Sequence, residues 1–394
     1  MNRPHMSRLA DPAPRGFLRR HAVKLIASIA ITAGILYTAG KGDIKLVPES
    51  GDFGAVRWWF LGAYFAIIFA MTWFRSVRWR FLLRPIIEVP KLRLFAVSCA
   101  GFAAILLLPF RLGEFARPYM LRTRDEDRKP GAPVLSMVAA TSSIVAERVI
   151  DGMFLSIVLA IVLVFVPTVH PLPEHVVGLR IAGVEVPLST VRASGFAMLG
   201  IFAAGLATIV VFYFARGWAH RTTHLVIGKL SPRLADKLAT LAEHLADGLH
   251  VFGRARDVLG FLAETAAYWG LNALGLWVLA IGCGVVHANG SPMTFPEACG
   301  LMGMLGCAIL IPGPPGLLGV FQAGIYAGMT FYYPASIVIG AGAAYVFLLY
   351  VSQVILHLST AAWGLWYEGG TRRLRGALEA EPLAGEASAS MPGS

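Results

Sequence analysis

Long apolar stretches separated by short polar loops make up most of the chain. Crossing a bilayer as a helix takes about 20 apolar residues. Six stretches are interpreted as full spans, and they lie at Leu25–Ala39, Trp58–Trp79, Val134–Val166, Phe196–Phe214, Val258–Val286 and Ala335–Trp366. The pattern predicts an all-α fold, a polytopic membrane helix bundle with six full spans.

Two shorter apolar runs, Phe95–Leu108 and Phe295–Ile311, each end in a segment rich in glycine and proline. Basic residues flank the first run on both sides, so the chain is expected to return to the side from which it came. Such a segment is typical of a re-entrant hairpin, in which broken helices line a cavity inside the protein. We predict two re-entrant hairpins, the first entering from the cytoplasm and the second from outside.

The two breaks resemble each other. A shift of 206 residues aligns the pattern P-x-x-L-G-x-F, with Pro109 on Pro315, Leu112 on Leu318, Gly113 on Gly319 and Phe115 on Phe321. Broken-helix repeats of opposite orientation form midplane binding sites in many transporters. The match predicts an inverted repeat, although glycine and proline recur in any membrane hairpin.

Charge supports a membrane location over a nucleic-acid partner. The net charge is +11 with only 14% charged residues, against about 25% in soluble domains. The basic residues cluster in short loops beside the apolar runs, which places both termini in the cytoplasm of a cell (inner) membrane protein and argues against nucleic-acid binding. The predicted organisation is a basic cytoplasmic tail (1–24), one membrane domain (25–370) with a cytoplasmic amphipathic helix (231–253), and a disordered cytoplasmic tail (371–394).

Ionisable residues interrupt the membrane region at two places. Burying such groups costs roughly 2.5–3.5 kcal/mol each, so they usually face a cavity and have a function. Glu147 and Asp151 are four residues apart and share one face of a helix. When Arg122 is included, four arginines stand against three carboxylates, and the planar guanidinium groups suit a phosphate. The candidates are Arg111, Gly113, Glu114, Arg117, Glu147, Arg148 and Asp151. The alternative is a purely structural ion network.

The second break is uncharged. Its polar position is Gln322, which hydrogen-bonds either a lipid head group or a neighbouring helix, and its other candidates are Pro315, Gly316 and Gly319. The chain has no histidine, cysteine and carboxylate cluster with metal-ligand spacing and no nucleophile motif. We therefore predict no metal, no cofactor and no catalytic residue.

Three motifs together resemble the lysylphosphatidylglycerol synthase transmembrane-region family across about residues 20–370. They are LLLPFRLGEFARPYMLR, SSIVAERVID and PGPPGLLGVFQAG. The resemblance implies a flippase-like membrane fold, with Arg111, Gly113, Glu114, Arg117, Glu147, Arg148, Asp151, Pro315, Gly316 and Gly319 as motif residues. The chain departs from the family by carrying Gln322 where a glutamate is common, which weakens a proton-coupling role for that position.

The resemblance implies translocation of an aminoacylated phospholipid or a polyprenyl-linked sugar. Family members that make aminoacyl lipids carry a soluble acyltransferase domain, which we do not expect here because the chain ends soon after its last span. The predicted function is a lipid flippase for an anionic phospholipid or a polyprenyl-linked lipid. Its predicted partners are membrane lipids with an anionic phosphate head group, and either a second copy of the chain or a lipid-modifying enzyme. The alternatives are an accessory subunit or an enzyme of lipid-linked sugar pathways, and a structural membrane scaffold.

Overall fold

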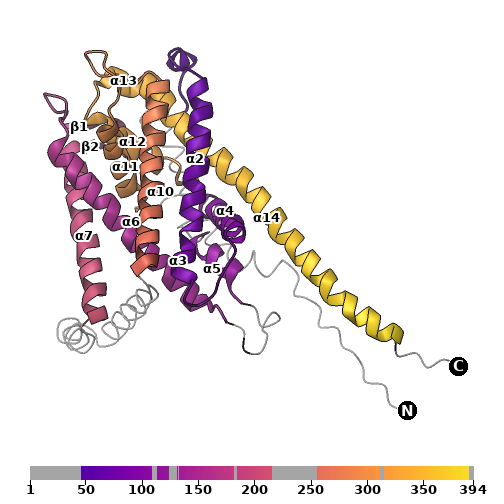
Figure 1. Cartoon of the computed structure of the whole chain (residues 1–394). Helices are drawn as coiled ribbons and strands as arrows, with labels where there is room; N and C mark the ends of the chain where they lie inside the picture. The colour runs from indigo at the N-terminus through magenta and orange to yellow at the C-terminus, as the bar shows by residue number, and fades with distance from the viewer. Residues whose placement is uncertain are drawn as a thin grey trace.

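The computed structural model describes residues 46–108, 113–123, 131, 133–181, 184–214, 255–310 and 315–389 (Figure 1). Several sequence predictions lie outside these residues: the basic tail 1–24, the first span Leu25–Ala39, the amphipathic helix 231–253, and the positions of Pro109 and Arg111. The described part is almost entirely helical, which confirms the predicted all-α membrane bundle.

Five helical stretches in the described part are long and apolar enough to cross a membrane. They are Trp59–Leu83, Met137–Phe165, Leu188–Gly205, Arg256–Gly282 and Ala341–Gly370. The corresponding helices are α2 (Trp59–Val77) with α3 (Trp79–Leu83), α6 (Met137–Phe165), α7 (Leu188–Phe214), α10 (Ala255–Gly282) and α14 (Ala341–Ala389). Each of these stretches matches one of the predicted spans.

The boundaries of two spans differ from the predictions. α7 begins at Leu188, directly after a two-stranded sheet of β1 (His175–Ile181) and β2 (Val184–Pro187). The final span is divided at Gly340, whose backbone is not helical, into α13 (Ala335–Ile339) and α14. α14 then continues to Ala389, so there is helix in most of segment 371–394, where the sequence predicts disorder. Alanine, leucine and glutamate in that segment favour helix.

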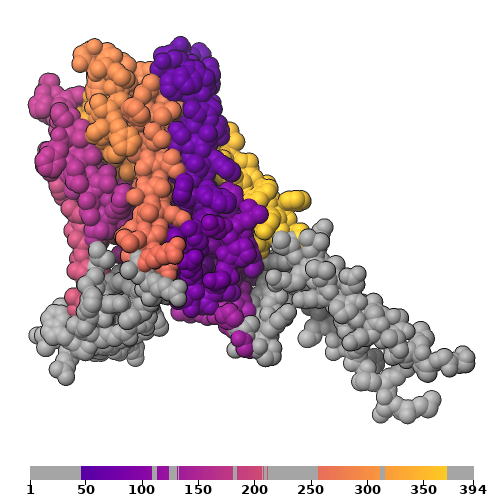
Figure 2. All heavy atoms as spheres, in the orientation of Figure 1, coloured from indigo at the N-terminus to yellow at the C-terminus, as the bar shows by residue number. Residues whose placement is uncertain are grey.

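Helices α2 and α10 run antiparallel and lie side by side (Figures 1 and 2). Gly282 at the end of α10 faces Phe60 near the start of α2, and Gly260 faces Phe81 in α3. This pairing defines two ends of the bundle. The basic end carries Arg80, Arg84, Lys91, Arg93 and Arg256, and the opposite end carries Trp59, Gly282 and the β-hairpin.

The first hairpin starts at the basic end and returns to it. α4 (Lys91–Leu107) leads into the bundle, and α5 (Ala116–Leu121) follows the break. Leu94 in α4 and Leu121 in α5 belong to one buried apolar cluster, which also contains Leu83 and Leu135. Because α4 begins and α5 ends in the same cluster, the chain turns back within the bundle.

The second hairpin starts at the opposite end. α11 (Phe295–Ile309) runs inward, a short 3-10 helix η5 (Pro315–Leu317) follows, and α12 (Val320–Thr330) returns. Gly324 of α12 packs on Leu305, and Gly328 packs on Leu301, so α11 and α12 are antiparallel. The two hairpins therefore enter from opposite ends, as the sequence predicts, while their relation as an inverted repeat stays a prediction.

The two breaks meet beside the inner end of α4. Gly113 lies so close to the backbone of Ala104 and Ile105 that a Cβ atom there would overlap it. η5 of the second break packs on α4, and Gly316 has φ +74°, a conformation that glycine adopts without strain. The Tyr350 hydroxyl donates a hydrogen bond of 3.0 Å to the Gly316 carbonyl. Glycines thus allow both breaks to reach the middle of the bundle.

Candidate functional site

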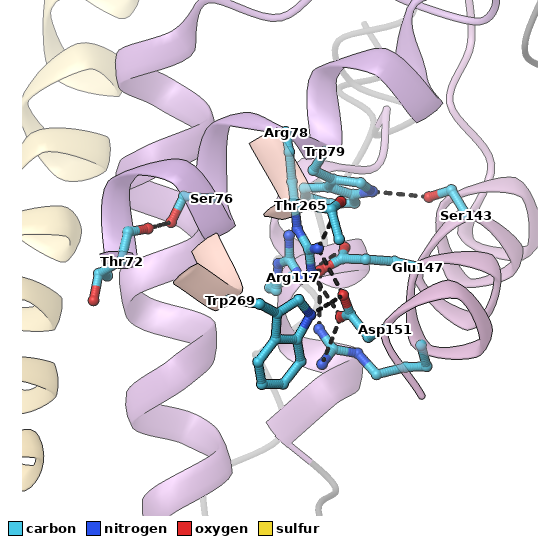
Figure 3. Close-up of polar contacts among 11 residues, drawn as sticks. Thr72, Ser76, Arg78, Trp79, Arg117, Ser143, Glu147, Asp151, Thr265 and Trp269 are labelled. Atoms are coloured by element: carbon cyan, nitrogen blue, oxygen red, sulfur yellow. Dashed lines mark hydrogen bonds and ion pairs between the residues drawn. The ribbon is translucent and has the colours of Figure 1, made fainter. Parts of the chain in front are cut away.

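A buried cluster of charged side chains lies where α2, α5, α6 and α10 meet (Figure 3). Arg78 stands between α2 and α3 and is 0% exposed, as is Glu147 in the first half of α6. We call this set the charge cluster, and its members are Arg75, Arg78, Arg117, Glu147, Arg148 and Asp151. Its arginines come from three separate parts of the chain.

Arg78 makes the largest number of contacts in the charge cluster. Its Nη1 and Nη2 each donate to one oxygen of Asp151 at 2.6 Å, a bidentate pair. Nη2 also donates to Glu147 at 2.9 Å, and Nη1 to the Thr265 hydroxyl at 3.1 Å. Figure 3 shows both carboxylates pointing toward this guanidinium group. A bidentate arginine–carboxylate pair fixes orientation as well as distance, so Arg78 connects α6 to the end of α2 and to α10.

Glu147 is shared by three arginines. Besides Arg78, it accepts a hydrogen bond from Arg117 Nη1 at 3.3 Å and from Arg148 Nη2 at 2.9 Å. Arg148 Nη1 also lies 3.6 Å from Asp151. Glu147 therefore links α5 of the first hairpin to α6.

Aromatic side chains enclose the charge cluster. The Arg117 guanidinium lies 4.4 Å from the centre of the Trp79 ring, and the Trp79 indole donates to the Ser143 hydroxyl at 2.9 Å. On the other side the Trp269 indole donates to Asp151 at 3.2 Å. Rings that face cations contribute about 0.5–2 kcal/mol each. They pack against the charged side chains of the cluster and help to hold them in place.

The two carboxylates of the charge cluster lie well inside α6, a helix long and apolar enough to cross a membrane. Glu147 and Asp151 follow the start of α6 by roughly 15 and 21 Å at about 1.5 Å per residue. Removing an ion from water costs several kcal/mol, which only good pairing offsets. Pairing is incomplete here, because Arg75 Nε and Arg117 Nε and Nη2 are buried without a hydrogen-bond partner in the part that the structure describes.

A cavity of about 580 Å³ opens beside the charge cluster. Arg75, Arg148 and Asp151 form its charged wall, together with Glu114 from the first break. Gly316 and Leu317 of the second break line it too, and most of its remaining surface is apolar. Two apolar lining residues, Phe115 and Leu310, are 51% and 49% exposed. The cavity therefore combines a charged wall with apolar side chains that are accessible from outside the protein interior.

The family of the chain follows from a match along most of its length. The family model described as the lysylphosphatidylglycerol synthase transmembrane region matches residues 25–356. The chain belongs to this family. Membership and the apolar helices make it an integral membrane protein, and they indicate a role in lipid synthesis or translocation. Neither a curated protein nor a solved structure matches the chain significantly.

The family's motif residues have different places in the structure: some line the cavity, some belong to the charge cluster, and others pack at the two breaks. Glu114, Arg148, Asp151 and Gly316 line the cavity. Arg117 and Glu147 belong to the charge cluster but are not among the lining residues, and Gly113 packs on the backbone of α4. Pro315 begins η5, and Arg111 lies outside the described residues.

Gln322 has a local partner in the structure. Its Oε1 accepts a hydrogen bond of 2.7 Å from the backbone N–H of Gly319 and so caps the start of α12. The side chain is 2% exposed and is not among the residues that line the cavity. The sequence leaves two roles open for Gln322, a lipid head group or a helix neighbour. The structure shows the second, because Gln322 accepts from the backbone N–H of Gly319 at the start of the same helix.

Arg78 and Arg75 are not among the site residues that the sequence predicts. Both stand in the basic flank of the second predicted span, where the positive-inside rule already accounts for them. A signal was available, because the two arginines are three residues apart and still within the apolar helix, where a purely topological charge has no reason to lie. Two residues of α10 gave no signal in the sequence: Thr265, which accepts from Arg78, and Trp269, which donates to Asp151.

Proposed function

We propose that the protein is a flippase, which moves an anionic phospholipid or a polyprenyl-linked lipid between the leaflets of the membrane. One observation carries the proposal. A single cavity combines cationic side chains, an apolar lining, and exposed apolar residues at its margin. A lipid has the same division into an anionic head group and apolar chains, so this cavity fits both of its parts.

The head group would lie against the charged wall. Arg75 and Arg148 present guanidinium groups to the cavity, and arginine binds phosphate through two parallel hydrogen bonds. The carboxylates of the charge cluster take a different role, because Glu147 and Asp151 are occupied by Arg78, Arg117 and Arg148. These carboxylates orient the arginines, and the lipid phosphate neutralises the positive charge that remains.

The two hairpins supply the route. They enter from opposite ends of the bundle, and their breaks meet beside the cavity. A head group between the breaks is about equally far from both membrane surfaces, which is where alternating access requires a substrate site. We further propose that the basic end faces the cytoplasm of a cell membrane, since cytoplasmic loops carry an excess of lysine and arginine.

The proposal is tested by transport in proteoliposomes. Vesicles that contain the purified protein and a trace of fluorescent phosphatidylglycerol are treated with dithionite, which quenches only the outer leaflet. We expect the native protein to expose inner-leaflet lipid faster than empty vesicles do. Arg148→Gln should slow this at least tenfold, because a charge-assisted hydrogen bond is worth about 1.5–3 kcal/mol.

The matched control is Arg84→Gln. Arg84 is an arginine of the basic end that pairs with Asp257, with its side chain 48% exposed and away from this cavity. It should transport lipid like the native protein. If the native protein moves no lipid, or if both variants transport equally well, the flippase proposal is lost. The alternatives that would then remain are an accessory subunit or an enzyme of lipid-linked sugar pathways, and a structural membrane scaffold.

A further inference from the structure

A second polar cluster lies at the end of the bundle opposite the basic end. His287 stands in the loop between α10 and α11, and Glu297 in the first turn of α11. Tyr332 and Tyr333 follow the end of α12. We call these four residues the clasp. None of them lines the cavity beside the charge cluster.

Glu297 is buried and depends on His287 for a neutralising charge. Its Oε2 accepts a hydrogen bond of 2.8 Å from the Thr294 N–H and one of 2.9 Å from the Tyr333 hydroxyl. The residue is 5% exposed. Residues 258–371 include no lysine or arginine. Among the residues that the structure describes, His287 is the one basic side chain in ion-pair contact with Glu297.

Both ring nitrogens of His287 face oxygen atoms. Nδ1 lies 3.3 Å from the backbone carbonyl of Tyr332, and Nε2 lies 3.2 Å from the carboxyl group of Glu297. A carbonyl and a carboxylate only accept, and a neutral imidazole donates from one nitrogen only. The two contacts together therefore need one proton more than a neutral ring and a carboxylate hold. This holds whether the ring or the carboxyl group carries that proton.

The clasp connects three parts of the chain. The His287 ring stacks on Tyr333, with the ring centres 4.8 Å apart. His287 thereby joins its own loop to Glu297 at the start of the second hairpin and to Tyr332 and Tyr333 at the hairpin's end. Its side chain is 22% exposed, so water can deliver or remove the proton.

We propose that the clasp is a pH-sensitive fastening of the second hairpin, closed by the proton shared between His287 and Glu297. Histidine gains and loses its proton between about pH 5 and pH 8. A neutral ring leaves a lone pair facing either the Tyr332 carbonyl or the Glu297 carboxylate, so one contact is lost. The closed form binds more protons than the open form, and its stability therefore falls as the pH rises.

The other titratable groups against the ring do not reverse this direction. Tyr332 and Tyr333 are phenols, which ordinarily keep their proton up to about pH 10. Exposed glutamate takes up a proton near pH 4.3, so the direction holds above about pH 5. The clasp lies outside the proposed lipid site, and its closure does not depend on lipid transport.

The experiment measures how often the loop of His287 opens. In cysteine-free protein, Val285→Cys places a thiol at a fully buried position of this loop, and Ala288→Cys places one at an exposed position. A maleimide reaches the buried thiol only when the loop opens. Dividing its rate by the rate at the exposed position removes the pH dependence of the thiol reaction itself. We call this quotient the opening ratio.

The opening ratio should rise about five- to thirtyfold between about pH 5.5 and pH 8, because an exposed imidazole loses its proton near pH 6.5. His287→Gln should abolish the rise, since an amide does not titrate. Glu297→Gln should abolish it too, and glutamine still suits the third position of a capping box. Thermal unfolding checks that each variant is folded.

Two controls separate the proton from ordinary packing. Tyr333→Phe removes one neutral hydrogen bond and should raise the opening ratio about two- to tenfold at both pH values, with the pH dependence kept. His175→Gln changes a half-exposed histidine that pairs with Glu185 in the β-hairpin. It should behave like the native clasp.

The proposal is overturned if the opening ratio of the native clasp does not change with pH, or if His287→Gln keeps the full rise. Should His287→Gln fail to fold, Glu297→Gln and Tyr333→Phe decide. The rise is expected to vanish in the first and persist in the second, and the reverse would also overturn the clasp. Because no lipid transport is measured, failure of the clasp leaves the flippase proposal standing, and failure of transport leaves the clasp standing.

Discussion

Arg78→Met is the substitution with the clearest expected cost to stability. Arg78 donates four hydrogen bonds from a fully buried position. Without it, Asp151 keeps only the Trp269 indole at 3.2 Å and Arg148 at 3.6 Å. Removing one partner of a buried ion pair costs about 3–5 kcal/mol, because the other charge stays buried without adequate compensation. By contrast, Arg84→Met breaks a partly exposed pair and should cost about 0–1 kcal/mol.

The free energy of unfolding is measured in lipid bicelles by steric trapping, for the native protein and for both variants. Asp151→Leu and the double variant, Arg78→Met with Asp151→Leu, complete a double-mutant cycle, and the double variant removes both charges. Replacing a whole buried pair by apolar groups is often close to neutral. The double variant should therefore be more stable than Arg78→Met alone, with Glu147 still held by Arg117 and Arg148.

Two results would refute this reasoning. If Arg78→Met costs no more than Arg84→Met, the carboxylates do not depend on Arg78. If the double variant loses the sum of the two single losses within about 0.5 kcal/mol, the two residues are energetically independent. Either result would mean that the close contacts of Arg78 contribute little to the stability of the bundle.

Three further predictions test the hairpins and the orientation. Gly113→Ala should destabilise the protein strongly in the same unfolding assay, because the added Cβ overlaps the backbone of α4. As the control, Gly62→Ala should raise helix stability by up to about 1 kcal/mol, because nothing lies within 4 Å of the added Cβ. Gln322→Met should cost about 1 kcal/mol through the lost cap and leave transport unchanged; a transport defect larger than the loss of stability explains would assign Gln322 to the lipid site. The topology is tested with a membrane-impermeant maleimide on cysteine-free protein into which single cysteines are placed. The reagent should label Glu88→Cys only from the cytoplasmic side and Ala288→Cys only from outside. Labelling of both positions from one side would contradict the proposed topology.

The fold was largely predictable because the bilayer imposes a length on each apolar stretch. All the spans predicted within the described residues exist, and the two short runs end in breaks as expected. Boundaries were less predictable where the chain leaves the membrane. The loop before α7 contains a β-hairpin whose Val177 N–H donates to the Thr330 hydroxyl of α12. Such a contact joins residues distant in sequence, and no local pattern indicates it.

The site was predictable only where its residues are close in sequence. Glu147 and Asp151 share a helix face, so their cooperation followed from their spacing. Arg78 could not be assigned to them in the same way, because 69 and 73 residues separate it from its two carboxylates. Arg78 also stands at the end of a span, where the positive-inside rule is enough to explain an arginine. The sequence therefore gives no reason to assign Arg78 to an ion pair as well.

The arginines of the charge cluster divide into two groups by what neutralises them. Arg78 and Arg117 are fully buried and paired with carboxylates, and they join α2 and the first hairpin to α6. Arg75 faces the cavity without a carboxylate among the described residues, and Arg148 both faces the cavity and holds Glu147. Substitution of Arg78 should therefore lower stability more than lipid binding, and substitution of Arg75 should do the reverse. Under the proposed function, a lipid phosphate in the cavity would supply the anion that Arg75 lacks as an ion-pair partner among the described residues.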